Sequence, residues 1–579
     1  MGRYRQILLW LLMLCASAPA ARLEITIDPV FQGAPLRLDS LALTNASGEA
    51  LSVTRLSYLL SGFALEREDG TWQEFPGTHA WLDAAARRNV IQLPEAPPAF
   101  YRAIRFHVGP PPEDNTKNPA AFSAGHPLNS ALNGLHWSWQ GGYIFMALEG
   151  HFRTGGSDPM GYAWHLARDP NRTRISLAVP LDLRQDSGLQ LQFDLANLFS
   201  APRPLSLVRD GSATHSREGD PIAAALTANL PGAFRLHRLF SAAPSAVDKP
   251  PLPPLDLPDK ITPWPFTMSR TFPVPDLPRD NPLIAERVTL GEKLFHDPIL
   301  SRNGTISCAT CHQPAAAFTD RLPVSAGIDG RPGDRNAMPL FNLAWKQHFF
   351  WDGRTATLRE QVLQPIADHR EMDESPARVC EKLAASPGYS AAFAAAFRSP
   401  GITPAKLALA MEQYLLTLTA HDSRFDRALA GKATLTGIEQ HGFELFMTES
   451  DLRTGQRGAD CFHCHGGPLF TDHQFHNNGL TTTDRGRARV TGAAADQGKF
   501  VTPSLRNIAL TAPYMHDGRF QTLEEAVAHY HTGITRSATL DPNLAKHPAP
   551  GLRLSSEDQV ALIAFLKTLT DSRFAAPIE

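Results

Sequence analysis

Two Cys-x-x-Cys-His strings limit what this chain can fold into more than any other feature. They run from Cys308 to His312 and from Cys461 to His465. In such a string the two thiols add to the vinyl groups of a haem, and the adjoining histidine binds its iron. A zinc or redox Cys-x-x-Cys site is the alternative, but zinc normally takes four ligands, and both strings carry the immediate histidine. The sequence therefore predicts two covalently bound c-type haems, held by Cys308, Cys311, His312, Cys461, Cys464 and His465.

The first twenty residues are typical of a secretion signal. Arg3 and Arg5 are followed by an apolar run from residue 7 to residue 16 and by small residues at 18–20. The run is about half as long as a bilayer span requires. Cys15 leaves open a lipid-anchored form, although Leu14 is bulky where such signals favour a small residue. We expect a signal peptide at 1–20, export to the periplasm, and no membrane span after cleavage.

Composition and the remaining cysteines narrow the class further. Four of the five cysteines after the signal belong to the two strings, so a disulfide framework is not expected. Cys380 is left alone in an apolar, helix-like stretch and is predicted to be a buried thiol. The 579 residues exceed what one hydrophobic core organises, which indicates two or three domains. A net charge of −3 argues against a basic surface that binds nucleic acid.

Residues 21–240 are predicted to form an all-β sandwich domain. Short segments alternate apolar and polar residues, and turn-type clusters such as 45–48 and 68–70 separate them. The clearest predicted strands are 23–27, 101–108, 144–148, 175–179 and 189–195. Many short strands without a long helical period favour an antiparallel sandwich. Residues 241–280 are rich in proline and are predicted to be a stiff linker between two units that can move relative to each other.

From residue 281 onward the pattern is helical. Apolar residues recur at helical spacing in the segments 284–295, 378–397, 404–418, 523–531 and 557–569. The segments Gly291–Phe295 and Gly442–Phe446 resemble each other, and each leads into a haem string. This repeat predicts a mainly α, two-lobe cytochrome c region, with an N-terminal lobe at 281–430 and a C-terminal lobe at 431–579.

Residues 280–579 resemble the bacterial di-haem cytochrome c peroxidases, including their MauG-like members. The motifs that carry the resemblance have the spacing of that family. They are Phe350-Trp351-Asp352-Gly353-Arg354, Glu360-Gln361, Pro365, Glu371-Met372, Leu505-Arg506-Asn507 and Thr511-Ala512-Pro513-Tyr514.

The resemblance implies a role for each matching residue. The haem on His312 would react with peroxide, and Trp351 would pass electrons between the two irons. Gln361, Pro365 and Glu371 match the pocket on the peroxide side, where a carboxyl group can move a proton between the two oxygens. Asn336, Thr511 and Pro513 match a calcium site between the lobes, since amide and carbonyl oxygens suit a hard cation.

Two positions depart from the ordinary peroxidase pattern. Such enzymes often carry a removable histidine ligand where this chain has Ile328, so we expect the peroxide haem to be permanently open. The second haem usually takes a methionine, and that position here is Tyr530. A phenolate stabilises higher iron oxidation states and lowers the potential. Tyr530 is therefore the predicted second ligand of the iron on His465, as in MauG-like enzymes; the rival ligands are Met515, His516, His529 and His531.

The N-terminal region resembles the MbnP-like copper-binding proteins. The matching stretches are His126-Pro127-Leu128-Asn129, residues 136–145 from His136 to Phe145, and Gly161-Tyr162-Ala163-Trp164-His165. The resemblance implies that a MauG-like partner oxidises a tryptophan to kynurenine near a histidine copper site. Imidazole suits copper, so His126, His136 and His165 are the predicted ligands. The chain lacks the cysteine that some members carry after the histidine at 165, which weakens this mapping.

Together the two resemblances imply an exported oxidoreductase with two c-type haems, calcium and copper. Hydrogen peroxide would oxidise the first haem site, and Trp137 or Trp139 of the chain's own N-terminal domain would be the substrate. Two alternatives remain open. One is a cytochrome c peroxidase that removes peroxide, with small periplasmic electron-transfer proteins as donors. The other is a copper-binding electron-transfer protein.

Overall fold

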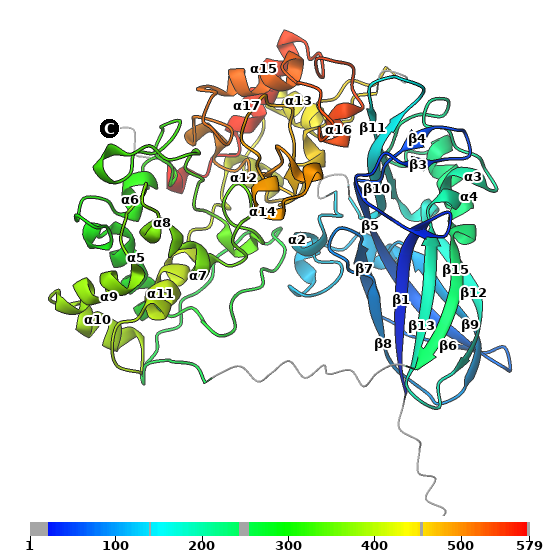
Figure 1. Cartoon of the computed structure of the whole chain (residues 1–579), viewed down its shortest axis with the longest axis horizontal. Helices are drawn as coiled ribbons and strands as arrows, with labels where there is room; N and C mark the ends of the chain where they lie inside the picture. The colour runs from blue at the N-terminus through cyan, green and yellow to red at the C-terminus, as the bar shows by residue number, and fades with distance from the viewer. Residues whose placement is uncertain (1–20, 138–140, 242–253, 452–454, 576–579) are drawn as a thin grey trace, which may run out of the picture.

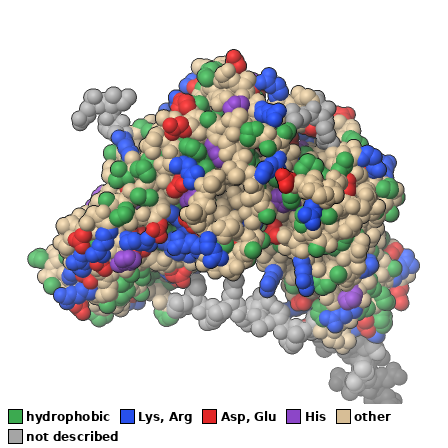
Figure 2. All heavy atoms as spheres, turned by 45° about the horizontal axis from the view of Figure 1, so that its top comes forward, with side chains coloured by type: hydrophobic (Ala, Val, Ile, Leu, Met, Phe, Trp, Pro, Cys, Tyr) green, Lys and Arg blue, Asp and Glu red, His purple; other side chains and the backbone are tan. Residues whose placement is uncertain are grey.

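The computed structural model describes residues 21–137, 141–241, 254–451 and 455–575, so the signal predicted at 1–20 lies outside the described residues. Figure 1 shows a β-rich N-terminal part beside a helical C-terminal part. This arrangement confirms the predicted fold class, an all-β sandwich followed by a mainly α two-lobe region. The face in Figure 2 carries acidic as well as basic side chains.

Two sheets form the β-rich part. The smaller sheet has the order β15-β13-β1-β2, with β8 also paired to β1. Its strands are β1 (Ala21–Phe31), β2 (Ala34–Pro35), β8 (Val90–Ala96), β13 (Ser187–Asp194) and β15 (Phe234–Ser241). The larger sheet has the order β12-β9-β5-β10-β11-β14, with four short strands attached. Its strands are β3 (Leu43–Thr44), β4 (Ala50–Leu51), β5 (Arg55–Arg67), β6 (Trp72–Glu74), β7 (His79–Asp83), β9 (Phe100–Val108), β10 (Ile144–Arg153), β11 (Met160–Ala167), β12 (Thr173–Asp182) and β14 (Ala213–Thr214).

Aromatic side chains from the two sheets meet in the core between them. Tyr58 of β5 packs edge-on against Phe193 of β13 at 5.3 Å between ring centroids. Phe106 of β9 packs in the same way against Phe234 of β15 at 5.4 Å. Such pairs add to the burial of large apolar rings, so they hold the two sheets face to face.

The sandwich differs from the sequence prediction in two respects. All five predicted strands are present, but β1 pairs with β13 in parallel, from Leu23 opposite Ser187 to Val30 opposite Asp194. A long connection through the larger sheet separates these two strands, which is what a parallel pair requires. The part also contains the helices α1 (Pro112–Asn115), α2 (Ser130–Asn133), α3 (Ala196–Ser200) and α4 (Pro221–Ala233). The longest of them, α4, starts at Asp220, whose side chain caps its first turn.

The described part of the proline-rich segment is packed against its surroundings. Phe272 is fully buried, and the Trp345 indole Nε1 donates to Pro273 O at 2.7 Å. Asn129 Nδ2, from the β-rich part, donates to Val274 O at 3.0 Å. Residues 254–280 therefore contact both parts of the molecule, whereas the composition predicts a stiff linker between two units that can move relative to each other.

The helical part contains two lobes. The first holds α5 (Ala285–His296), α6 (Cys308–Cys311), α7 (Leu358–Gln361), α8 (Gln364–Ala367), α9 (Pro376–Ala385), α10 (Tyr389–Ala396), α11 (Pro404–Leu416) and α12 (Arg424–Leu429). The second holds α13 (Gly437–Phe446), α14 (Ala488–Thr491), α15 (Leu523–Thr532), α16 (Pro542–Ala545), α17 (Ser556–Lys567) and the strands β16 (Phe475–His476) and β17 (Phe500–Val501). The helix predicted at 378–397 is in fact two, since Gly388 adopts a φ of 86° between α9 and α10.

A glycine lies at the crossing of the main helix pair in each lobe. In the first lobe α5 crosses α11, and a Cβ at Gly291 would overlap the carbonyl oxygen of Ala410. In the second lobe α13 crosses α17, and a Cβ at Gly442 would overlap the carbonyl oxygen of Ala561. These glycines belong to the two repeated sequence segments, so the repeat encodes the same close helix crossing twice.

The β-rich part contacts the second lobe through β10, β11 and α16. His151 Nε2 donates to Leu540 O at 2.8 Å, and Asn543 Nδ2 donates to Glu149 Oε2 at 3.2 Å. Gly161 of β11 faces Pro542 so closely that a Cβ would overlap its carbonyl oxygen. None of the helices in the described part of the chain has the length and apolar character that a membrane crossing needs.

Candidate active site

The first haem string occupies a short, capped helix that opens onto a cavity. Ser307 and Thr310 form a reciprocal cap at the start of α6, which fixes Cys308 and Cys311 on one turn. His312 Nδ1 donates to Phe318 O at 3.0 Å, so Nε2 is the nitrogen left for a metal. The residues present therefore fit a covalently attached haem.

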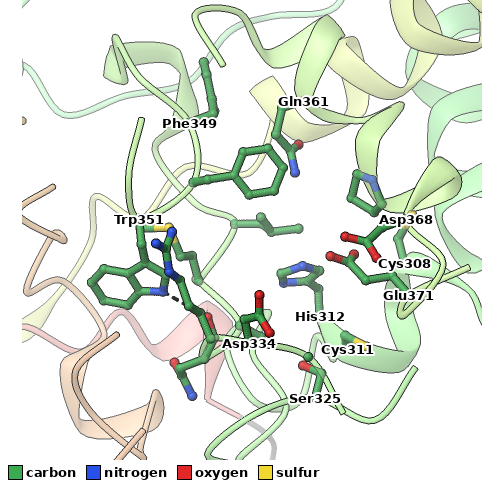
Figure 3. A pocket seen from close by; sticks show the side chains of 18 of the residues that line it. Cys308, Cys311, His312, Ser325, Asp334, Phe349, Trp351, Gln361, Asp368 and Glu371 are labelled. Atoms are coloured by element: carbon green, nitrogen blue, oxygen red, sulfur yellow. Dashed lines mark hydrogen bonds between the residues drawn. The ribbon is translucent and has the colours of Figure 1, made fainter. Parts of the chain in front are cut away.

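The cavity beside His312 has a volume of about 530 Å³, within the range of small-molecule and cofactor sites. Figure 3 shows His312 and the two cysteines on one side, with Trp351, Gln361 and Glu371 around the same space. Gln361, Pro365 and Glu371, which are predicted to lie on the peroxide side, all line it. Trp351 and Asn336, which are predicted to serve electron transfer and calcium binding, line it as well.

Glu371 is the titratable group in this cavity that suits proton transfer at neutral pH. Burial raises the pKa of its carboxyl to about 7, and the nearby negative charge of Asp368 adds to the rise. Arg354 and Arg370 act in the opposite direction. A carboxyl with this pKa can both accept and return a proton, as a general acid–base group must.

Ile328, the position at which the family resemblance implies a removable histidine in many peroxidases, is hydrogen-bonded to the backbone of Glu371. It is fully buried, and its backbone N–H donates to Glu371 O at 2.8 Å. A Cβ at the preceding residue, Gly327, would overlap Arg370 O, so this turn is tightly packed against the 370–371 backbone. An apolar side chain held here offers no ligand to an iron.

Trp351 connects the cavity to the second lobe. Its indole Nε1 donates to Asn336 O at 2.9 Å, and Val501 N of the second lobe donates to Trp351 O at 2.9 Å. The neighbouring Arg335 guanidinium binds the carboxylates of Asp352 and Asp484, one from each lobe, at 2.7 Å. These contacts hold the indole at the junction of the two lobes.

The second haem string is arranged like the first. His465 Nδ1 donates to Phe470 O at 3.2 Å, which again leaves Nε2 for a metal. Asn478 Nδ2 donates to Tyr530 Oη at 3.3 Å and to Met515 Sδ at 3.4 Å. Burial raises the pKa of the Tyr530 phenol to about 12. Tyr530 and Met515 thus lie near the same amide.

The rival histidines have other partners. His529 Nε2 donates to Asn478 O at 2.9 Å, and the His516 ring stacks on Phe500 with 3.8 Å between centroids. His531 Nδ1 is buried without a hydrogen-bond partner among the described residues. Tyr530 as the second iron ligand remains a prediction.

The calcium assignment also remains a prediction. Asn336 N donates to His516 O at 2.8 Å, so the first-lobe residue reaches the segment that follows Pro513. Thr511 Oγ1 donates to Ile508 O at 3.3 Å.

The three histidines predicted to bind copper do not form a three-ligand group among the described residues, although His136 and His165 line the same small cavity. His126 stacks on Phe122 and lies beside His79, while His136 packs against Tyr143. His165 instead groups with His215 and His463, each offering one nitrogen within 4.8 Å of the others. The copper assignment to His126, His136 and His165 stays a prediction, and the structure brings only His165 into such a group.

Trp137 lies against this histidine group, and Trp139 lies outside the described residues. The Trp137 ring is 5.5 Å from the His215 ring and 6.3 Å from the His165 ring. His215 and His463 were missed from the sequence, because no motif surrounds His215 and the residues between the cysteines of a haem string are variable in type. Asp368, near Glu371, was also missed, because it belongs to no motif.

These features define a class: a di-haem c-type cytochrome with a cavity beside its first haem string and a fused β-sandwich. A family model described as di-haem cytochrome c peroxidase matches residues 285–434, and one described as MbnP matches residues 20–216. The methylamine utilization protein MauG of Methylorubrum extorquens is 38% identical over 297 residues, which cover 50% of this chain and 80% of that protein. The chain belongs to the MauG-like di-haem cytochrome c peroxidase family, with an MbnP-like domain fused in front.

Two further proteins are similar to this chain. The cytochrome c551 peroxidase of Nitrosomonas europaea is 34% identical over 322 residues, covering 54% of this chain and 88% of that protein. A solved MauG-like protein associated with microbial copper homeostasis is 37% identical, with a TM-score of 0.48, and covers 54% of this chain and 98% of that one. The chain is thus an oxidoreductase of the di-haem peroxidase type, and its family implies two c-type haems and hydrogen peroxide as the oxidant.

Proposed function

We propose that this protein uses hydrogen peroxide to oxidise Trp137 of its own N-terminal domain. The observation that carries the proposal is the position of that indole. Its ring neighbour His215 lies 5.6 Å from the ring of Phe462 and 4.9 Å from that of His463, both inside the second haem string. An oxidising equivalent on the haem of His465 therefore needs to cross only one layer of side chains.

The chain's own residues supply the remaining steps. When bound, the haems would pass two electrons from Trp137 to peroxide, which takes up two protons and becomes two waters; the oxygen gained by the oxidised indole would come from water. Glu371 accepts the proton of the incoming peroxide and returns it to the departing oxygen, which its pKa of about 7 permits. Gln361 orients the peroxide, and Trp351 provides the electron path between the lobes. Tyr530 as phenolate ligand would hold the second haem in a high oxidation state, and Asn336, Thr511 and Pro513 would hold calcium at the lobe junction.

In this proposal the N-terminal signal directs the protein to the periplasm, where the oxidation takes place. Fusion of substrate and enzyme keeps the substrate at a high effective concentration, so no diffusing partner is needed for the modification.

Peptide mass spectrometry of the holoprotein tests the proposal. Protein treated with peroxide should gain oxygen at Trp137, whereas the E371Q variant, purified in the same way, should stay unmodified. W137F and W139F variants separate the two candidate positions, because only the first should abolish the gain. Full haem content with no oxidised N-terminal tryptophan would instead favour a peroxidase that consumes peroxide with reduced cytochromes, and steady-state turnover with such a donor would then be expected.

A further inference from the structure

The cavity beside the first haem string contains a lysine that has no carboxylate partner among the described residues. Lys346 lines this cavity, and its Nζ lies 3.7 Å from Met338 Sδ, which is a weak acceptor. The ammonium also lies 5.9 Å from the centroid of the Phe349 ring. Neither contact balances a full positive charge.

The other basic side chains that line the cavity each form an ion pair. The pairs are Arg335 and Arg354 with Asp352, and Arg370 and Arg489 with Asp334. Among the described lining residues, the charge that remains uncompensated is therefore that of Lys346. Burial without a partner lowers the pKa of this ammonium to about 8.

Lys346 lies on the same side of the cavity as Trp351. Its neighbour Met338 is two residues after Asn336, whose carbonyl oxygen accepts from Trp351 Nε1 at 2.9 Å. Lys346 also faces the second lobe, where burial lowers the pKa of His473 to about 4 and the lysine charge adds to the fall. The ammonium is thus held near the junction of the two lobes.

The carboxylates of a haem bound in this cavity would extend toward the same side. Thioether bonds to Cys308 and Cys311 fix one edge of the porphyrin, and the two propionates leave from the opposite edge. Figure 3 shows Trp351 across the cavity from these two cysteines. The edge that carries the propionates therefore faces the region that contains Lys346.

A propionate and the Lys346 ammonium each supply what the other lacks. A carboxylate taken out of water without an opposite charge is unfavourable, and so is an ammonium. A direct pair at hydrogen-bond distance offsets the loss of water for both groups. The cavity has room for a cofactor, and its unpaired cation has the charge that a propionate requires.

We propose that Lys346 pairs with a propionate of the haem on His312 and raises the reduction potential of that haem. A fixed positive charge near the iron favours the ferrous form, which carries one positive charge less than the ferric form. Lys346 acts through the propionate and does not touch the iron, so it is a positioning residue. The inference concerns the resting holoprotein and does not depend on the oxidation of Trp137.

Redox titration of the holoprotein tests the proposal, with each haem followed by its own electron paramagnetic resonance signal. K346M should lower the midpoint potential of the haem on His312 and shift the propionate bending bands in the resonance Raman spectrum. K346R keeps the charge and should stay close to the wild type in both measurements. K432M is the matched control for net charge and should leave both unchanged, because Lys432 is exposed and does not line the cavity. If K346M does not take up both haems, K346Q, which keeps a polar side chain, replaces it.

Four results would overturn the proposal. An unchanged potential and unchanged propionate bands in haem-replete K346M would mean that the lysine has another partner. A shift confined to the haem on His465 would assign the lysine to the second haem. Equal shifts in K346M and K432M would reduce the effect to net charge, and equal shifts in K346M and K346R would reduce it to packing. Oxidation of Trp137 is measured separately, so either idea can fail while the other stands.

Discussion

The carboxyl of Glu371 sets the pH at which the peroxide cavity works. Burial and the Asp368 charge hold its pKa at about 7, so below this pH the group is protonated and cannot accept a proton from peroxide. The rate of reaction between peroxide and the oxidised protein should therefore rise as pH increases through 7. In E371Q this rise of the rate with pH, the pH limb, should vanish. The rate at high pH should fall about 100-fold or more. Stopped-flow absorption measures both.

The D368N variant gives a sharper version of this experiment. Removing the negative charge beside Glu371 lowers the pKa of Glu371, so the pH limb should move to lower pH while keeping its shape. A limb that stays in place in D368N and persists in E371Q would assign the titration to another group.

Tyr530 and Met515 are the two candidate ligands of the second iron that accept from the side-chain amide of Asn478. If Tyr530 binds the iron, the Y530M variant should raise the reduction potential of the haem on His465, because a thioether favours the reduced ion more than a phenolate does. Redox titration followed by visible absorption measures the shift. M515L is the matched control, since Met515 accepts from the same Asn478 amide. A raised or lowered potential in M515L, with none in Y530M, would identify Met515 as the ligand.

At the residue scale, the sequence predicts a site when the residues that form it lie close together along the chain. The haem strings could be read directly, because covalent attachment requires its residues within five consecutive positions. The residues predicted for the peroxide side came from a family spacing, and they line one cavity, while their role stays a prediction. The grouping of His165 with His215 and His463 could not be predicted, since packing between domains decides which imidazoles meet, and no local pattern marks them.

At the scale of elements, the repeated Gly-x-x-Leu-Phe segments make a stability prediction. The G442A variant places a methyl group against the carbonyl of Ala561, and helix α13 must move away from α17. Overpacking of this kind typically costs about 1–3 kcal/mol. The midpoint of urea unfolding, followed by haem absorption, should fall accordingly.

G437A in the same helix is the control. A Cβ at Gly437 meets nothing within 4 Å, so this variant should be neutral or slightly stabilising because alanine favours the helix. Equal effects of the two substitutions would mean that helix propensity, and not the close crossing, controls the result.

Strand and helix positions were largely predictable, whereas their partners were not. Alternation located β1 and β13, but it carries no information about which strand lies beside which, so their parallel pairing was missed. The apolar period from 378 to 397 continued through Gly388, whose left-handed backbone breaks the helix. The packed course of residues 254–280 also escaped prediction, because proline-rich composition describes local stiffness and not tertiary contacts.

At the scale of the whole molecule, the contact between sandwich and second lobe should control where oxidation goes. Gly161 is an ordinary β residue whose missing side chain lets β11 approach Pro542 and Lys546. In G161A the added methyl group has no room, so the contact should loosen by about 1–3 kcal/mol. Peroxide should still react with the haems at the wild-type rate, but oxygen incorporation at Trp137 should drop, because electron transfer weakens steeply as the indole moves away from the haem string.

G156A tests whether this effect belongs to the contact. Gly156 lies in the turn between β10 and β11, and a Cβ there meets nothing within 4 Å. Mass spectrometry after a fixed exposure to peroxide should show the wild-type yield of modified Trp137 in G156A and a reduced yield in G161A. Unchanged modification in G161A would mean that the docked arrangement is not the one in which the tryptophan reacts.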